Sequence, residues 1–365
     1  MGDPLRPQSS QTENAAQRYL LCRPRGGFND CLVQMENCFQ YAAKFNRTLF
    51  IDCSSEKTLN DLSAFFSLLD PMQSVFLNTD KQQIAVFNTM VCFPPQVQGI
   101  LDSYKTAAFD VIGLGTSVQC CLAGTKTTLL LDFDVDHSEQ IVVHENWGGS
   151  RRGFQFLKRL KLHEALAAEF RSQISALGQG YAAVHIRHTD MQTDWHWFLT
   201  KLKGKLRGRT VLVCSDNADV IKAAASILCN SAVKTISDIL PTDGRPLHLR
   251  DDLVAEAYQR VMKSALRDLF ALGGASDLFL TASKTGSMSG YSRLAGEICL
   301  NKDVLASILG TSLDTLNSPV GRLHIVRSFQ DWSKRRLRKI KNQFKTVVSK
   351  IVAAIRPHSS LKGPS

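Results

Sequence analysis

The chain has 365 residues, of which 44% are hydrophobic and 21% are charged, a composition that excludes wholesale disorder. Its length favours two globular domains over one. Residues 333–365 hold ten Lys or Arg and no Asp or Glu, which leaves only +1 of the net charge of +11 for the rest of the chain, and a near-neutral body argues against binding of nucleic acid.

The N-terminal residues, the apolar runs and the cysteines together predict the cellular compartment. Residues 1–17 are polar and lack the apolar core of a secretory signal, so we expect a disordered N-terminus. No apolar run is long enough to predict a membrane-spanning helix. The ten cysteines are scattered through apolar runs without CxxC spacing. This favours reduced, buried thiols in the cytoplasm over a zinc cluster.

The first predicted unit is a strand, a helix and a second strand, at 18–22, 31–45 and 48–52. The loop before the helix contains Gly26 and Gly27, which allow a tight turn and the close approach of a ligand. Asn29 and Asp30 stand where an N-cap is expected. Such a loop can bind an anion at the helix N-terminus, although a purely structural turn has the same sequence.

The middle of the chain is less regular. We expect a helix at 62–69, strands at 127–135 and 140–146, and one long helix at 154–174. Asp132, Asp134 and Asp136 alternate along the expected strand, a pattern that fits a solvated face better than a metal site. The glycine-rich break at 177–180 marks the domain boundary.

The second half alternates strands with helices. Strands are expected at 181–186, 210–216, 232–237 and 276–283, and helices at 194–202, 217–228, 251–272 and 293–300. This order predicts a parallel sheet covered by helices on both faces.

Polar residues follow the strand at 181–186. His185 and Arg187 alternate on one side of its carboxyl end, where ligands bind in such sheets. A guanidinium suits a phosphate or a carboxylate. Asp190 and Asp194 follow in the loop, and Asp216 ends the next strand. The alternative for this stretch is an ordinary strand end with a solvated loop.

A third polar loop precedes the last predicted helix. Ser287, Ser289 and Ser292 offer hydroxyl and N–H groups to a phosphate, or Ser289 simply caps the helix. The loops at 26–30, 185–194 and 283–292 all leave the carboxyl ends of predicted strands. A diphosphate bound between two α/β domains would use all three.

Three motifs, in order, resemble the superfamily of α1,6 (nodulation-type), α1,2 and protein O-fucosyltransferases. RPRGGFNDCLVQMENCFQYAAKFNRTLFID is similar to its first βαβ unit, with Arg47, Thr48 and Leu49 as the R-T-L strand. VHIRHTD resembles its HxRxxD signature, and DLFLTASKTGSMSGYSRLAGEI its serine-rich donor motif. The resemblance covers about residues 18–300 and implies a GT-B-type fold: two Rossmann-like domains, 18–177 on the acceptor side and 178–330 for the nucleotide sugar, with a cleft between them.

The resemblance also implies an inverting, metal-independent transferase with no cofactor that uses GDP-fucose as donor and a glycan hydroxyl as acceptor. Arg187 would hold the β-phosphate and offset charge on the departing GDP. The other donor-binding positions it implies, together with those read from the residues, are Gly26, Gly27, Asn29, His185, Asp216, Asp268, Ser287, Ser289 and Ser292. Of these, His185 and Asp268 would lie on the guanine side.

The resemblance suggests the general base by the position of a residue in the signature loop. Asp194 falls, with a one-residue gap, where the α1,6 branch has a Glu, and Asp190 is the alternative; either residue can instead cap the loop. His188 replaces an Arg that is frequent after the arginine of the signature, and Met288 interrupts the serine pair. These departures leave open a catalytically inactive relative that binds a nucleotide or a glycan.

The segment 331–365 forms the predicted basic tail. Within 333–356, apolar residues recur at helical spacing among Lys and Arg, at Leu337, Ile340, Phe344, Val347, Ile351 and Ile355. Such a basic amphipathic helix suits an anionic membrane surface, here the inner face of a membrane, and an envelope or lipid-linked acceptor. Packing of the helix on the body is the equal alternative.

Overall fold

The computed structural model describes residues 17–54, 59, 61–71, 74–110, 118–149, 151–237, 254–284, 286–315 and 320–326. Residues 1–16 and the predicted basic helix at 333–356 lie outside these ranges. Internal contacts divide the chain into two compact units, Met1–Lys161 and Leu162–Ser365. No helix among the described residues has the length and apolar character needed to cross a membrane.

The first unit is built on a sheet of five parallel strands in the order β4-β2-β1-β8-β5. These strands are β1 (Tyr19–Arg25), β2 (Thr48–Ile51), β4 (Val75–Phe76), β5 (Cys92–Phe93) and β8 (Ile141–Trp147). Two smaller ladders pair β3 (Phe66–Leu68) with β9 (Leu160–Leu162), and β6 (Thr106–Asp110) with β7 (Val118–Leu122). The helical elements are α1 (Phe28–Lys44), η1 (Leu62–Ala64), α2 (Lys81–Phe87), η2 (Pro95–Val97) and α3 (Gly153–Leu157).

Helix α1 packs against β1 and β2 because its apolar residues recur on one face, and Leu32, Met35 and Phe39 are buried there. The opposite face of the sheet carries its own core around Leu21, Phe87 and their neighbours. Burying a side chain of this size contributes on the order of 2 kcal/mol. The two cores fix the strands whose carboxyl ends carry the polar residues described below.

The second unit holds another sheet of five parallel strands, in the order β12-β11-β10-β13-β14. These strands are β10 (Ala182–Ile186), β11 (Thr210–Ser215), β12 (Ala232–Lys234), β13 (Asp277–Thr281) and β14 (Arg322–Val326). The helical elements are α4 (Glu164–Ser175), α5 (Trp195–Leu206), α6 (Ala218–Ile227), α7 (Ala255–Gly274), α8 (Gly290–Leu300), α9 (Lys302–Ile308) and η4 (Leu313–Thr315). The two parallel sheets confirm the predicted α/β class.

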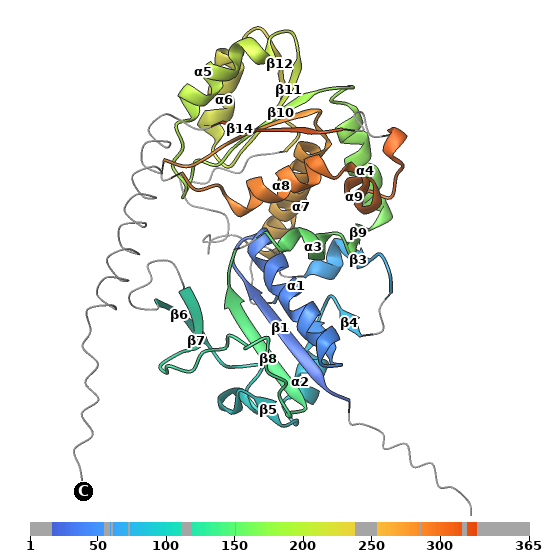
Figure 1. The fold of residues 1–365 in the computed structure, drawn as a ribbon, viewed down its shortest axis with the longest axis vertical. Helices are drawn as coiled ribbons and strands as arrows, with labels where there is room; N and C mark the ends of the chain where they lie inside the picture. Colours follow the sequence, from blue (N-terminus) through green and yellow to red (C-terminus); the bar gives the residue numbers. More distant parts are fainter. Residues whose placement is uncertain are drawn as a thin grey trace, which may run out of the picture. The chain divides into compact units, whose positions relative to one another are not determined.

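Helices cover both faces of the second sheet (Figure 1). The even-numbered residues of β10, such as Val184 and Ile186, pack in one core with α5 and α6. The odd-numbered His185 faces the other side, where it contacts α8. Because side chains alternate along a strand, His185 points toward α8, whereas the other polar residues of the signature follow the end of β10.

Contacts place α4 with the second unit, so the division falls between Lys161 and Leu162, before the glycine-rich break expected as the boundary. Phe170 of α4 packs against Phe270 of α7, with ring centroids 6.3 Å apart. An ion pair of 2.6 Å joins Glu169 to Lys263 on the same two helices.

Three predicted elements have another secondary structure than expected. The single helix expected at 154–174 is two helices, α3 and α4, separated by β9, whose buried–exposed–buried pattern at Leu160–Leu162 follows a strand period. The helix expected at 62–69 is the short η1 followed by β3. The strand expected at 127–135 is absent from these described residues, which hold a single bridge, from Thr128 to Cys121, and an Asx turn at Asp132.

Candidate active site

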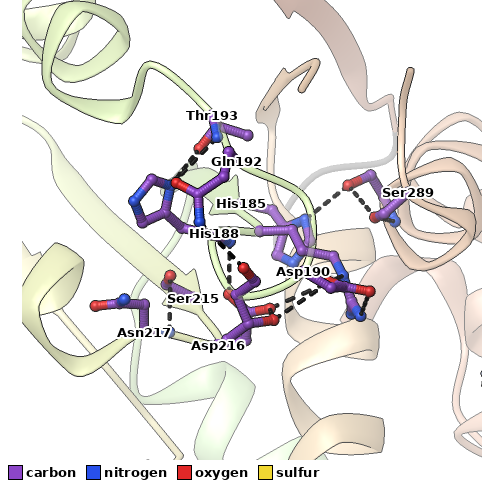
Figure 2. Close-up of polar contacts among 12 residues, drawn as sticks. His185, His188, Asp190, Gln192, Thr193, Ser215, Asp216, Asn217 and Ser289 are labelled. Carbon is purple, nitrogen blue, oxygen red and sulfur yellow. Dashed lines mark hydrogen bonds and ion pairs between the residues drawn. The ribbon is translucent and has the colours of Figure 1, made fainter. Parts of the chain in front are cut away.

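His185 connects β10 to the N-terminus of α8. Its side chain is buried, and Nδ1 lies 2.8 Å from Oγ of Ser292. Oγ of Ser292 lies 2.8 Å from Oγ of Ser289, which also caps α8 by accepting from the backbone N–H of Ser292 at 3.0 Å (Figure 2). Burial lowers the pKa of His185 to about 4, so its imidazole is neutral at pH 7. A neutral ring can receive or give one proton within this hydrogen-bonded chain.

Arg187 follows directly after β10 and forms a two-pronged ion pair with Asp190. Its Nε and Nη2 donate to the two carboxylate oxygens of Asp190, at 2.8 and 3.0 Å. Partial burial opposes ionisation of Asp190, but the hydrogen bonds and charge of Arg187 outweigh it and lower the pKa of this carboxyl. The Arg187 side chain keeps 25% of its surface exposed. The guanidinium is therefore oriented and reachable from solvent.

Asp216, at the end of β11, holds the loop that carries Arg187. One carboxylate oxygen accepts from the backbone N–H of His188 at 2.7 Å, and the other from Oγ1 of Thr189 at 2.6 Å (Figure 2). The second oxygen also lies 3.8 Å from Nε of Arg187. A carboxylate that accepts from a backbone N–H and a hydroxyl fixes the path of a loop. Asp216, expected among the donor-binding residues, thus positions Arg187.

The loop after Arg187 is closed by its own polar side chains. Nδ1 of His188 accepts from the backbone N–H of Thr193 at 3.2 Å, and the Gln192 amide donates to the carbonyl of Thr189 at 3.2 Å. The backbone N–H of Lys284 donates to the carbonyl of Gln192 at 2.8 Å. This last bond joins the arginine loop to the serine-rich loop after β13, because β10 and β13 are paired neighbours in the parallel sheet.

The remaining predicted residues of these two loops make local contacts. The backbone N–H of Ser287 donates to Oγ of Ser283 at 3.2 Å, which closes the turn before α8. Asp194 is exposed and caps α5, with Oδ1 3.4 Å from the backbone nitrogen of Trp197. The cap uses one carboxylate oxygen of Asp194, Oδ1. Among the residues that the structure describes, none is hydrogen-bonded to the other oxygen.

Asp268 on α7 lies on the same side of the sheet as His185. It accepts from Oγ of Ser237 at 2.5 Å and from the thiol of Cys214 on β11. Burial raises the pKa of Asp268 to about 6, against the opposing effects of Ser237, the Arg267 charge and Cys214. Tyr291, which packs against His185 with ring centroids 5.1 Å apart, donates from its hydroxyl to the carbonyl of Ala265 on α7.

In the first unit, the glycine turn after β1 has the geometry that glycine permits. Gly26 has φ +102°, and Gly27 is the N-cap of α1. The helix therefore begins at Phe28, earlier than expected, and the prediction of an N-cap at Asn29 or Asp30 is wrong. The side chain of Asn29 is buried, and a Cβ on Gly153 would stand 2.8 Å from its Oδ1. Close packing of α3 on α1 explains the position of Asn29.

A network of buried charges, which the sequence analysis did not anticipate, lies at the carboxyl ends of β1 and β8. Nε of Arg23 donates to Asp52 at 2.7 Å, and Nε of Arg25 donates to Glu145 at 2.7 Å. The hydroxyl of Tyr104 donates to the other oxygen of Glu145 at 2.6 Å. Burial raises the pKa of Tyr104, so the phenol stays protonated and remains a donor.

No protein-family model matches the chain, and no curated protein matches it in sequence. NodZ α1,6-fucosyltransferase co-crystallised with GDP aligns over 77% of this chain and 92% of its own, with a TM-score of 0.51 and 17% identity. The chain has the NodZ fold.

Two further solved structures are similar. NodZ from Bradyrhizobium aligns over 76% of this chain and 92% of its own, with a TM-score of 0.50 and 18% identity. POFUT1 in complex with GDP-fucose aligns over 86% of this chain and 98% of its own, with a TM-score of 0.44 and 12% identity. The likeness to NodZ confirms the predicted GT-B-like architecture of two Rossmann-like domains, each with a parallel five-stranded sheet.

The structure brings six of the predicted residues together in the second unit, around the ends of β10 and β11 and the start of α8. They are His185, Arg187, Asp190, Asp216, Ser289 and Ser292. No group of three or more His, Cys, Asp or Glu side chains within the described ranges is arranged to hold a metal ion. Ser237 and Thr189 were missed, because a lone hydroxyl residue in a loop carries no sequence signal of its own.

Proposed function

We propose that this chain is an inverting glycosyltransferase that transfers fucose from GDP-fucose to a hydroxyl group of a glycan. One observation carries the proposal: the Arg187 guanidinium is held at the carboxyl end of β10, oriented by two carboxylates, and reachable by a phosphate. The NodZ fold supports it, since NodZ has been crystallised with GDP and soaked with GDP-fucose.

The proposed reaction needs stabilisation of a leaving diphosphate. The acceptor hydroxyl attacks the anomeric carbon, the bond from that carbon to the β-phosphate oxygen breaks, and negative charge accumulates on GDP. A guanidinium already oriented toward that charge stabilises the transition state more than the bound substrate. Arg187 fills this role, and Ser287 and Ser289 supply donors from the neighbouring loop.

A base must take the proton of the acceptor hydroxyl. Asp190 has both oxygens bonded to Arg187, which lowers its pKa and weakens it as a base. Asp194 is exposed and has a carboxylate oxygen outside its helix cap. We therefore assign the base to Asp194 and the role of an ion-pair partner to Asp190.

Calorimetry with GDP and GDP-fucose tests the donor, comparing the native chain with Arg187→Ala and with Arg207→Ala as a control at the exposed end of α5. Removing one charge-assisted phosphate contact costs on the order of 2 kcal/mol, which is about a 30-fold loss of affinity. Arg207→Ala should bind as the native chain does. Absence of GDP binding by the native chain would end the proposal.

A donor screen across GDP-, UDP- and dTDP-sugars, read as hydrolysis of the nucleotide sugar without acceptor, separates an enzyme from an inactive binding relative. We expect hydrolysis of GDP-fucose that Arg187→Ala abolishes and Arg207→Ala preserves. Tight GDP binding without turnover of any donor would instead support the inactive relative.

We also propose that the basic segment 333–356 attaches the protein to the inner face of a membrane from the cytoplasm. The support is its sequence pattern, in which each Lys or Arg near an anionic surface adds about 1 kcal/mol. Co-sedimentation with vesicles of phosphatidylcholine and phosphatidylglycerol should be lost in a chain that ends at Gln330. Equal co-sedimentation of both chains would remove this part of the proposal.

A further inference from the structure

Asp268 is contacted by Ser237 and Cys214, and Ser237 is in turn contacted by Arg267. Ser237, from the segment after β12, donates its hydroxyl to Oδ1 of Asp268 at 2.5 Å. Arg267 donates from Nε to the same Ser237 oxygen at 3.3 Å, and Cys214 approaches from β11. The hydrogen bond from Ser237 is a short contact to a half-buried carboxyl, so Ser237 bears directly on how Asp268 is oriented and whether it is ionised.

The hydroxyl of Ser237 has one proton and two acceptors within reach. Besides Oδ1 of Asp268, the carbonyl of Ser264 lies 3.0 Å away. When Asp268 is ionised, the carboxylate is the stronger acceptor and takes the proton. When Asp268 is protonated, Ser237 can turn to Ser264 and accept from the carboxyl instead. The serine therefore exists in two hydrogen-bonding states that match the two protonation states of Asp268.

We propose that Ser237 is a positioning residue that holds Asp268 as an oriented carboxylate and so sets the preference of this site for guanine over adenine. This inference rests on the proposed function and on the sequence resemblance, which implies that the guanine of GDP lies on the side of Asp268. Guanine presents two N–H donors on its Watson–Crick edge, at N1 and the 2-amino group. A carboxylate accepts from both, whereas adenine presents an acceptor at N1 that an ionised carboxylate repels.

Protonation of Asp268 reverses that preference. A protonated carboxyl can donate to N1 of adenine and accepts less well from guanine. The described groups that face Asp268 are Arg267 on its own helix, Cys214 on β11 and Tyr291 on α8, and burial dominates them, so its pKa is about 6. Ser237 donates to the ionised form, and its removal raises the pKa further. The ratio of GDP to ADP affinity should therefore fall as the pH drops through 6, and at a higher pH without Ser237.

The experiment measures GDP and ADP affinities by calorimetry between pH 5 and 8, for the native chain, Ser237→Ala and Ser237→Thr. Both nucleotides carry the same diphosphate, so titration of the phosphate cancels in the ratio. We expect Ser237→Ala to move the midpoint of the ratio upward by about half a pH unit or more and to lower the ratio at pH 7 severalfold. Ser237→Thr keeps the hydroxyl and should keep the native profile.

Two results would overturn the inference: an unchanged midpoint and ratio in Ser237→Ala, or a loss of affinity for both nucleotides by the same factor, which a merely structural role predicts. Failure of the native chain to bind GDP at any pH would instead remove the proposed function. A native chain that binds GDP and ADP equally well at pH 7.5 would refute the guanine preference while leaving a diphosphate site.

Discussion

Replacing Asp268 with asparagine should stabilise the second unit at neutral pH while weakening GDP binding. The pKa of Asp268 is about 6 in the folded chain, against 3.8 for an unperturbed Asp. Because the folded state holds its proton more tightly, this group favours folding most at low pH and loses that contribution as the pH rises from about 4 to about 6. At pH 7.5, ionised Asp268 therefore costs stability.

The magnitude follows from the shift. A difference of about two pKa units corresponds to about 3 kcal/mol, and solvent screening of a partly exposed side chain reduces this to about 2 kcal/mol. At pH 5, where the folded carboxyl is mostly protonated, the expected gain for Asp268→Asn is about half of that. The gain should therefore shrink as the pH is lowered.

Urea titrations at pH 7.5 and 5, with hydrogen exchange of amides in α7 and β11, would measure the effect in the second unit. Asp303→Asn, at an exposed position of α9, is the matched control and should show no such pH-dependent gain. A destabilised Asp268→Asn at pH 7.5, or a gain that is equal at both pH values, would refute the reasoning. Loss of GDP binding in the same variant would identify function as the reason for keeping the half-buried carboxyl.

Four further substitutions test single local features by urea unfolding. Ser289→Ala removes the cap of α8 and should lose about 1 kcal/mol, whereas Ser287→Ala, whose described contacts run through its backbone, should stay within about 0.5 kcal/mol. Gly26→Ala places a Cβ at φ +102° and 3.2 Å from Asp30, so a loss of about 1 kcal/mol or more is expected. Gly204→Ala, in α5 with open space around the new Cβ, should gain about 0.5 to 1 kcal/mol. Equal effects at Gly26 and Gly204 would contradict the conformational argument.

Much of the fold could be predicted from local sequence patterns. The strand expected at 181–186 and the helix expected at 293–300 are found at Ala182–Ile186 and Gly290–Leu300, because glycine, serine and apolar periodicity act over a few residues. The failures depend on distant partners. Leu160–Leu162 is a strand because it pairs with β3, which lies far away in sequence, and no local feature of the apolar run announces that pairing.

The contacts of the candidate site also fall into those that local sequence predicts and those that depend on distant partners. Arg187 and Asp190 are three residues apart, so their proximity follows from the motif itself. The hold of Asp216 on the same loop depends on the parallel pairing of β10 with β11, which sets His185 opposite Cys214. The contact of Ser237 with Asp268 depends on tertiary packing alone, and the Arg25–Glu145 pair of the first unit on the register of β1 with β8. A motif can therefore predict contacts between residues that are close in sequence, but it cannot predict contacts that depend on strand register or on tertiary packing.

The ion pair of Arg187 yields a last prediction, because Asp190 and a phosphate compete for the same guanidinium nitrogens. Asp190 binds Nε and Nη2, and its side chain is 36% exposed against 16% for Asp216. A diphosphate that approaches from solvent therefore meets the charge of Asp190 and must displace its hydrogen bonds. Exposed ion pairs of this kind are worth about 1 kcal/mol or less, so Asp190→Asn should tighten GDP binding up to about fivefold.

Calorimetry with GDP at low and high salt measures this competition, and Asp219→Asn, at an exposed position in the first turn of α6, serves as the control. The gain in Asp190→Asn should shrink as salt screens the repulsion between carboxylate and diphosphate. If Asp190→Asn instead weakens GDP binding, the carboxylate orients the guanidinium for the phosphate more than it competes with it. Retained transfer in this variant, together with its loss in Asp194→Asn, would assign the base to the residue that caps α5, because only that carboxylate keeps an oxygen outside the arginine pair.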